Sequence, residues 1–202
     1  MKIAVLDIET CDTVSTAIVP AIGITVIDTK NPRPVLLEHA NSENSLFVRL
    51  NAFDQEQRFE RTQSEDTMAW WRKQSDEARE FVFSNQNNCS VEQAMRKLVD
   101  FMNKHKPQRI YTRGPHFDYV VLCSLFADYP EFEKAFSHWN VRDCRTIVEF
   151  HTNSSKVKTE HDGFIYHHPT HDAVRDAIAI WDAWDWKKKI NAQTKANESE
   201  LV

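Results

Sequence analysis

Glycine is scarce in this chain of 202 residues, which has only Gly23, Gly114 and Gly163. Average usage would be roughly 7%. Because the three glycines lie far apart, the sequence has no Walker loop, no G-x-G-x-x-G dinucleotide loop and no nucleophile elbow, all of which need clustered glycines. Three large classes of nucleotide-binding and hydrolytic sites are therefore excluded.

Paired cysteines and long apolar runs are missing as well. The four cysteines, at positions 11, 89, 123 and 144, form no C-x-x-C pair, which excludes a zinc ribbon and a thioredoxin-type redox centre. Unpaired thiols suit a reducing compartment. No apolar run approaches the ~18 residues that a membrane span needs. We therefore expect a cytoplasmic protein with no membrane partner.

Positive charge is in deficit, because the formal net charge is −5. Lysine and arginine drive phosphate contact, so this balance argues against broad adhesion to nucleic acid or to an anionic membrane. Two divalent cations held by acidic residues would offset most of the negative charge and would make an acidic cleft attractive to phosphate.

The composition, 41% hydrophobic and 27% charged, fits one compact domain. We expect this domain to cover residues 1–190, followed by a frayed or disordered polar tail at 191–202. Hydrophobic patterns predict strands at 2–8, 21–28, within 35–50 and at 109–113. Helices are expected after the N-caps Ser64, Ser75 and Ser90, at 117–126 and at 172–190. Strands followed by alternating helices and strands indicate an α/β domain around a mixed sheet.

Acidic residues stand where two of these elements end or begin. Asp7 and Glu9 close the first strand, whose period-two alternation puts both carboxylates on one face. Such a pair on a buried strand needs a positive neighbour, and oxygen ligands suit Mg²⁺ or Mn²⁺. The alternative is that the strand has ended and both side chains face water. Asp118 opens a helix, where a carboxylate is also favourable without any further role.

The last expected helix contains His171 and Asp176. Five residues turn the helix by about 500°, so these two side chains lie about 140° apart around its axis. They converge only if His171 belongs to the start of the helix, which Pro169 and Thr170 favour. Alone, His171 is more typical of a surface residue. The tandem His167 and His168 have no third ligand at a suitable spacing, so we interpret them as loop residues beside the cleft.

The ordered set of motifs is more specific than any of its parts. It comprises the acidic positions together with four segments: Trp-Trp-Arg-Lys-Gln-Ser-Asp-Glu-Ala-Arg (70–79), Arg-Gly-Pro-His-Phe-Asp (113–118), Val-Arg-Asp-Cys-Arg-Thr (141–146) and His-Asp-Ala-Val-Arg-Asp (171–176). Over about residues 1–190 this order resembles the DEDDh class of 3′→5′ exonucleases. More narrowly, it is similar to the exonuclease A family of T-even bacteriophages and to related exoribonuclease-like domains. The resemblance implies an RNase H-like fold, a mixed sheet flanked by helices.

The resemblance also implies a reaction. The enzyme would hydrolyse single-stranded DNA or RNA from a free 3′ end and release nucleoside 5′-monophosphates, in a bacterial or phage-infected cell. Two Mg²⁺ or Mn²⁺ ions would be held by four carboxylates, and His171 would accept a proton from water; the carboxylates are those of Asp7, Glu9, Asp118 and Asp176. DNA is the first choice because of the phage deoxyribonucleases. RNA as substrate, a non-catalytic binding module and an endonuclease of the same fold are the alternatives, and the oligomeric state is left open.

Substrate contacts follow in part from the resemblance, which implies that groups around Ile8 and Thr10 meet the terminal nucleotide. Trp70 and Trp71 are candidates to stack on a base. Because they diverge by about 100° on a helix, we expect one at most to face the cleft and the other to fill the core. Phe117 carries the same two alternatives.

Arg113 and Arg145 are the candidate cations of the cleft. They could contact phosphate or position the carboxylates, and the alternative is a structural ion pair.

Overall fold

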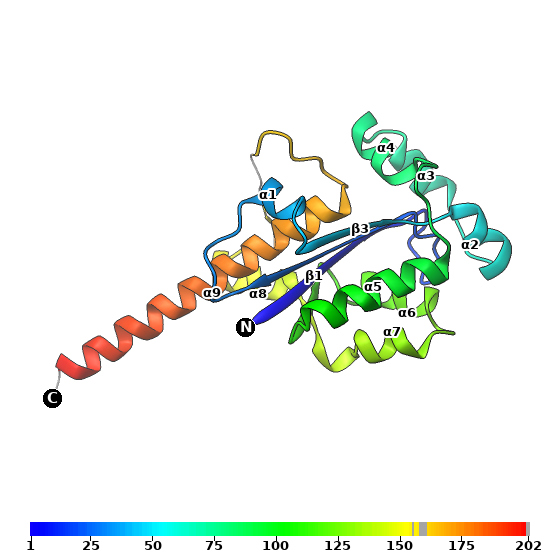
Figure 1. The fold of residues 1–202 in the computed structure, drawn as a ribbon. Coiled ribbons are helices and arrows are strands. Elements are labelled where there is room, and N and C mark those ends of the chain that lie inside the picture. Colours follow the sequence, from blue (N-terminus) through cyan, green and yellow to red (C-terminus); the bar gives the residue numbers. More distant parts are fainter. Residues whose placement is uncertain (155, 158–160, 201–202) are drawn as a thin grey trace.

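The computed structural model describes residues 1–154, 156–157 and 161–200. Its centre is a five-stranded sheet in the order β3-β2-β1-β4-β5, with helices on both faces (Figure 1). The strands are β1 (Lys2–Glu9), β2 (Ala21–Asp28), β3 (Ser45–Arg49), β4 (Arg109–Thr112) and β5 (Val141–Asp143). β1 to β3 form an antiparallel meander, β4 pairs in parallel with β1, and β5 pairs in parallel with β4. The mixed α/β architecture is thus confirmed.

Helices form the two outer layers and the far end of the sheet. They are α1 (Leu36–Ala40), α2 (Ala52–Phe59), α3 (Glu65–Trp71), α4 (Asp76–Phe83), α5 (Val91–His105), α6 (Asp118–Leu125), α7 (Pro130–Ala135), η1 (His138–Asn140), α8 (Cys144–Thr152) and α9 (Pro169–Glu200). In Figure 1, α5, α6 and α7 lie on one side of the sheet and α1, α8 and α9 on the other, while α2, α3 and α4 gather beyond the carboxyl end of β1.

The alternation along β1 supplies both layers with core residues. Ala4, Leu6 and Ile8 belong to the core formed with α5, α6 and α7. Ile3 and Val5 belong to the opposite core, formed with α8 and α9. Asp7 and Glu9 continue the Ile3 and Val5 side of the strand. Both carboxylates are therefore directed toward α9, where further acidic residues lie.

Local capping signals set several helix starts as the sequence predicts. The side chains of Ser64 and Ser75 accept hydrogen bonds at the starts of α3 and α4. Ser90 and Gln93 form the full capping box of α5. These bonds satisfy backbone donors that the first helical turn leaves free. Capping depends on neighbouring residues alone, which makes it readable from sequence.

The last helix is longer than its pattern indicates, since α9 begins at Pro169 and continues to Glu200. Proline at the first position has the backbone angle that a helix needs. Residues 191–200 contain no glycine or proline, so nothing local stops the helix. Residues 201–202 of the expected tail lie outside the described residues. Within the described chain, no helix combines the length and apolar character that a membrane crossing requires.

Several short elements escape the sequence pattern altogether. α1, α2, α7, α8 and β5 were not predicted, and each has fewer than ten residues. Over one or two turns, a helical period cannot be told from an irregular apolar run.

Candidate active site

Five carboxylates, four of them buried, converge from three elements at the carboxyl end of β1. Glu9 is 7% exposed and Asp118, the first residue of α6, is 6% exposed. From α9 come Asp172 and Asp176, one turn apart and both buried. Asp7 completes the group in the middle of the sheet. A hollow of about 440 Å³ opens over Asp7, Glu9 and Asp172.

Burial and mutual repulsion dominate the electrostatics of this group. Burial raises the pKa of Asp7 well above its ordinary value, and Asp172, Glu9, Asp118 and Asp176 raise it further. The pKa of Glu9 is also raised well above its ordinary value, by burial first and then by Asp172 and Asp118. Burial raises the pKa of Asp118 to about 8 against the opposing effect of Arg145. These carboxylates therefore need positive charge to ionise together.

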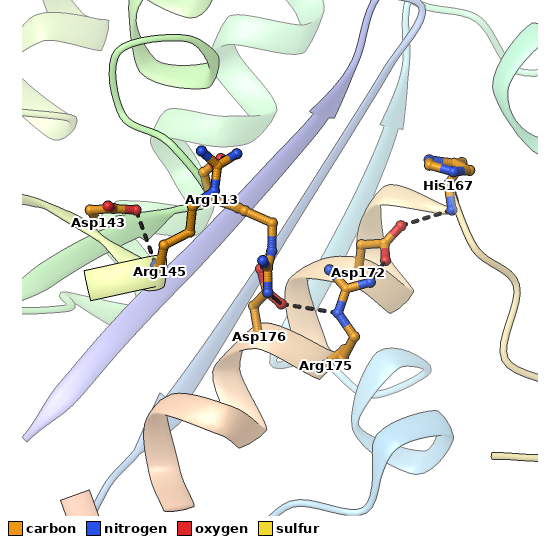
Figure 2. Close-up of polar contacts among 7 residues, drawn as sticks. All are labelled: Arg113, Asp143, Arg145, His167, Asp172, Arg175 and Asp176. Carbon is orange, nitrogen blue, oxygen red and sulfur yellow. Dashed lines mark hydrogen bonds and ion pairs between the residues drawn. The ribbon is translucent and has the colours of Figure 1, made fainter. Parts of the chain in front are cut away.

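Two arginines supply part of the positive charge, and both donate hydrogen bonds to Asp176 (Figure 2). Arg113 binds its carboxylate with two bonds, Nε to Oδ2 at 2.8 Å and Nη2 to Oδ1 at 3.0 Å. Arg175 donates from Nε to the Oδ1 atom of Asp176 at 3.0 Å and from Nη1 to Asp172. The carboxylate of Asp176 is thus neutralised by protein groups on both oxygens. The expected role of Asp176 as a metal ligand stays a prediction, in which an ion would share this carboxylate with the two arginines.

Asp172, which was not among the expected metal ligands, lies beside Glu9. Ligand atoms of Glu9, His167 and Asp172 all fall within 4.8 Å of one another. The Nδ1 atom of His167 is 3.8 Å from Oε1 of Glu9, and the backbone N–H of His167 donates to Oδ2 of Asp172 at 2.8 Å. The two carboxylates offer the oxygen ligands that suit Mg²⁺ or Mn²⁺, whereas an imidazole suits ions such as Zn²⁺ better. His167 is thus a loop residue, as interpreted, but two further possible metal ligands lie beside it.

His167 is held in an unusual backbone conformation. Its φ angle is +64°, in the left-handed region that non-glycine residues rarely adopt. Its ring lies edge-on to Trp70, with centroids 4.8 Å apart. Burial and Arg175 lower its pKa, which keeps the ring neutral near pH 7. A strained residue next to carboxylates is typical of a functional site.

His171, in the first turn of α9, contacts the loop that precedes this helix. Its Nδ1 atom accepts the backbone N–H of Ile165 at 3.1 Å. Its ring stacks on His168, with centroids 4.2 Å apart, and lies 5.8 Å from the ring of Phe164. Its expected role as the group that accepts a proton from water stays a prediction, and its ring packs against the same loop that carries His167.

The two tryptophans divide their roles as the helical geometry predicts. Trp71 is buried, and its Nε1 atom donates to the carbonyl of Thr10 at 2.9 Å. Trp70 is 42% exposed. A second hollow, of about 430 Å³, adjoins the first through Ile8 and Glu9, and its wall includes Thr10, Asp66, Thr67, Trp70 and Phe117. The expected contacts of the terminal nucleotide are thus gathered around one cavity.

Arg145 lies on the other flank of the site. Its Nη2 atom donates to the carbonyl of Arg113 at 3.0 Å, and its backbone N–H donates to Asp143 at 3.0 Å. Its guanidinium is exposed, and it counteracts the rise in the pKa of Asp118. Arg113 is paired with Asp176, so one arginine is an ion-pair partner and the other an exposed cation.

Gly23 determines how close α9 can approach the sheet. Gly23 is the register partner of Asp7, and the first turn of α9 lies directly on it. A Cβ atom at this position would be 2.2 Å from the carbonyl carbon of Pro169 and 2.3 Å from the nitrogen of Thr170. The missing side chain lets α9 bring Asp172 to Glu9.

The sequence does contain a signal for the residues that were missed. His167 and Asp172 have the same x4 spacing as His171 and Asp176, one helical turn earlier. Arg175 carries no comparable signal, because only the fold shows that its guanidinium bridges two carboxylates.

Comparison with known proteins agrees with this geometry. The 3′–5′ exoribonuclease Rv2179c-like domain family matches residues 2–186. The chain is also 24% identical over 198 residues to an exodeoxyribonuclease of Enterobacteria phage T4, covering 87% of this chain and 86% of the relative. A match that spans the sheet, both helix layers and every carboxylate of the site establishes that the chain belongs to the Rv2179c-like family of 3′–5′ exonucleases.

Proposed function

We propose that this exonuclease degrades single-stranded nucleic acid from a free 3′ end and releases nucleoside 5′-monophosphates, using two Mg²⁺ or Mn²⁺ ions. The observation that carries the proposal is the set of buried carboxylates that face one hollow. Their combined charge exceeds what the neighbouring arginines neutralise. We assign the ions to Asp7, Glu9, Asp118 and Asp172, and we assign Asp176 to the two arginines.

The residues of the chain then have distinct tasks. When bound, two divalent ions would supply the positive charge that stabilises the attacking and leaving oxygens of the phosphodiester. His167 lies beside Glu9 and Asp172 with a free imidazole nitrogen and would take the proton from the attacking water. The backbone bond to Asp172 orients this histidine. Arg113 and Arg175 hold the carboxylate of Asp176 in place, and Arg175 also holds that of Asp172.

The second hollow would hold the 3′-terminal nucleoside. Trp70 is the exposed ring that could stack on its base, an interaction worth ~1–3 kcal/mol and tolerant of sequence. Ile8 and Phe117 supply apolar walls, and Thr10 lies at the polar edge. The chain places this hollow next to the carboxylates, as removal of a terminal nucleotide requires.

DNA and RNA are the two candidate substrates of this site. The T4 relative is an exodeoxyribonuclease, which favours DNA. The matched family is described as exoribonuclease-like, which favours RNA. Discrimination between DNA and RNA depends on a contact to the 2′-hydroxyl. We retain single-stranded DNA as the first choice because of the T4 relative. The four cysteines are unpaired, which supports action in the cytoplasm.

End-labelled DNA and RNA oligonucleotides, incubated with and without Mg²⁺, test this function. We expect mononucleotides from linear single strands, no product in excess chelator, and survival of closed circular single-stranded DNA. Rapid cutting of the circles would make the protein an endonuclease. Undiminished cleavage in chelator would contradict the assignment of metals to the carboxylates.

A further inference from the structure

Arg61 is a buried cation with an unusual set of partners. It follows α2, is 5% exposed, and has no carboxylate within ion-pair distance in the described part of the chain. Burial lowers its pKa to about 10, so the guanidinium remains charged at neutral pH. Burying such a charge is costly unless hydrogen bonds compensate for the lost water.

The guanidinium joins two segments that are far apart in sequence. Its Nε atom donates to the carbonyl of Ala17 at 2.8 Å, and its Nη2 atom donates to the carbonyl of Ser15 at 3.0 Å. Both carbonyls belong to the connection between β1 and β2. On the other side, Nη1 donates to Oγ of Ser124 at 3.3 Å and Nη2 to the carbonyl of Val121 at 3.4 Å, both on α6.

Each of these segments carries a carboxylate of the site. The β1–β2 connection follows Glu9 directly, and α6 begins at Asp118, one turn before Val121. Backbone bonds fix the arginine's own segment to the same connection: Ile18 N–H donates to the Thr62 carbonyl at 2.8 Å, and Ser64 N–H donates to the Cys11 carbonyl at 2.9 Å. Arg61 therefore bridges the β1–β2 connection, six to eight residues after Glu9, to α6, three to six residues after Asp118.

We propose that Arg61 is a positioning residue, which fixes the separation between the strand end that carries Glu9 and the helix that carries Asp118. The inference rests on the proposed function, because that separation would set the spacing of the two metal ions. Stability alone does not explain a buried charge, since well-packed apolar residues often serve a core equally well. Directed bonds from one planar group to four acceptors instead specify a geometry.

Matched variants test this role. Arg61→Met removes the hydrogen bonds of the guanidinium but keeps an apolar side chain of similar length. Arg61→Lys keeps the positive charge but not the planar guanidinium. The control is Arg58→Met, since Arg58 is exposed and pairs with Asp54. For Arg61→Met we expect kcat to fall about 10–100-fold, as for other residues that orient metal ligands. We expect an unchanged KM, weaker Mn²⁺ binding by calorimetry and a smaller loss for Arg61→Lys.

Chemical rescue separates positioning from a general structural role. In Arg61→Ala, added guanidinium should restore kcat severalfold and strengthen Mn²⁺ binding, whereas Arg58→Ala should not respond. A folded Arg61→Met protein with wild-type kcat and Mn²⁺ affinity would overturn the proposal. If Arg61→Met does not fold, Arg61→Lys with wild-type Mn²⁺ affinity would overturn it equally. An inactive wild-type protein would instead contradict the proposed function, and the Mn²⁺ titrations would still report on Arg61.

Discussion

Individual side chains in this site are distinguished by their partners. Asp172 faces Glu9 and His167, whereas both oxygens of Asp176 are bound by arginines. The two acidic residues therefore have different partners, although they lie one turn apart on α9 and share Arg175. Paired substitutions on this helix test whether they also have different roles.

We predict that Asp172→Asn loses metal binding and activity, while Asp176→Asn retains Mn²⁺ binding and loses stability. Removing Asp176 leaves two arginines without their buried partner, a change that costs about 3–5 kcal/mol in comparable ion pairs. Calorimetric titration and thermal unfolding measure the two effects. Equal loss of Mn²⁺ binding in both variants would show that Asp176 is also a ligand.

The two histidines give a parallel comparison. His167→Ala should lower the rate by roughly 10²–10⁴-fold, as expected for a general base, and leave most Mn²⁺ affinity intact. His171→Ala should affect mainly stability, because its ring is stacked on His168 and its Nδ1 atom is bonded to Ile165. Single-turnover rates at saturating metal provide the measurement. A larger rate loss in His171→Ala would restore His171 as the candidate base.

At the scale of secondary structure, the critical contact is between β2 and the start of α9. Gly23→Ala would place a Cβ atom against backbone atoms of Pro169 and Thr170, which cannot yield by a side-chain rotation. We predict a loss of roughly 1–3 kcal/mol from overpacking and a larger loss of activity, since Asp172 and His167 flank the displaced residues. Urea unfolding measures the loss of stability, and kcat measures the loss of activity.

Gly163→Ala is the control for this contact. Gly163 has a φ angle of +80°, so alanine there is strained by roughly 1–2 kcal/mol. Its added Cβ would meet only the end of the Leu37 side chain. Activity should survive at a temperature where the protein stays folded. If both variants lost activity in proportion to stability, the β2–α9 contact would have no special role.

For the whole molecule, the concentrated carboxylates couple stability to pH and to metal. The folded-state pKa is raised to about 8 for Asp118 and to about 6 for Asp172, mainly by burial, against about 3.9 in an unfolded chain. Raised values mean that these groups contribute stability below about pH 4, and that this stability is lost as pH rises through 6 and 8.

We predict that Asp118→Asn is more thermostable than the wild type in chelator at pH 8.5, and that the difference disappears near pH 4. Asparagine cannot ionise, so the variant escapes the cost of a buried charge at high pH. Saturating Mg²⁺ should reverse the order at pH 8.5, because the wild type gains more from binding. Calorimetric melting over this pH range tests it. A pH-independent difference would remove Asp118 from the coupled group.

Some features of this protein follow from the sequence alone, because they depend on neighbouring residues. Alternation along β1 puts Asp7 and Glu9 on one face, and the Ser90–Gln93 capping box starts α5. The absence of clustered glycines excludes whole classes of site. Ordered motifs along the chain predict the family, which the match to residues 2–186 confirms.

Which histidine and aspartate around the start of α9 lie beside Glu9 was decided by the tertiary structure. The sequence offers the same spacing twice, at His167/Asp172 and at His171/Asp176, and a local pattern cannot choose between copies one turn apart. The choice depends on how far α9 advances over β2, which the missing side chain of Gly23 permits, and on Arg113 and Arg175, which bind Asp176. Gly23 and Pro169, like Arg113 and Asp176, are more than sixty positions apart in the sequence, so only the folded chain brings them together.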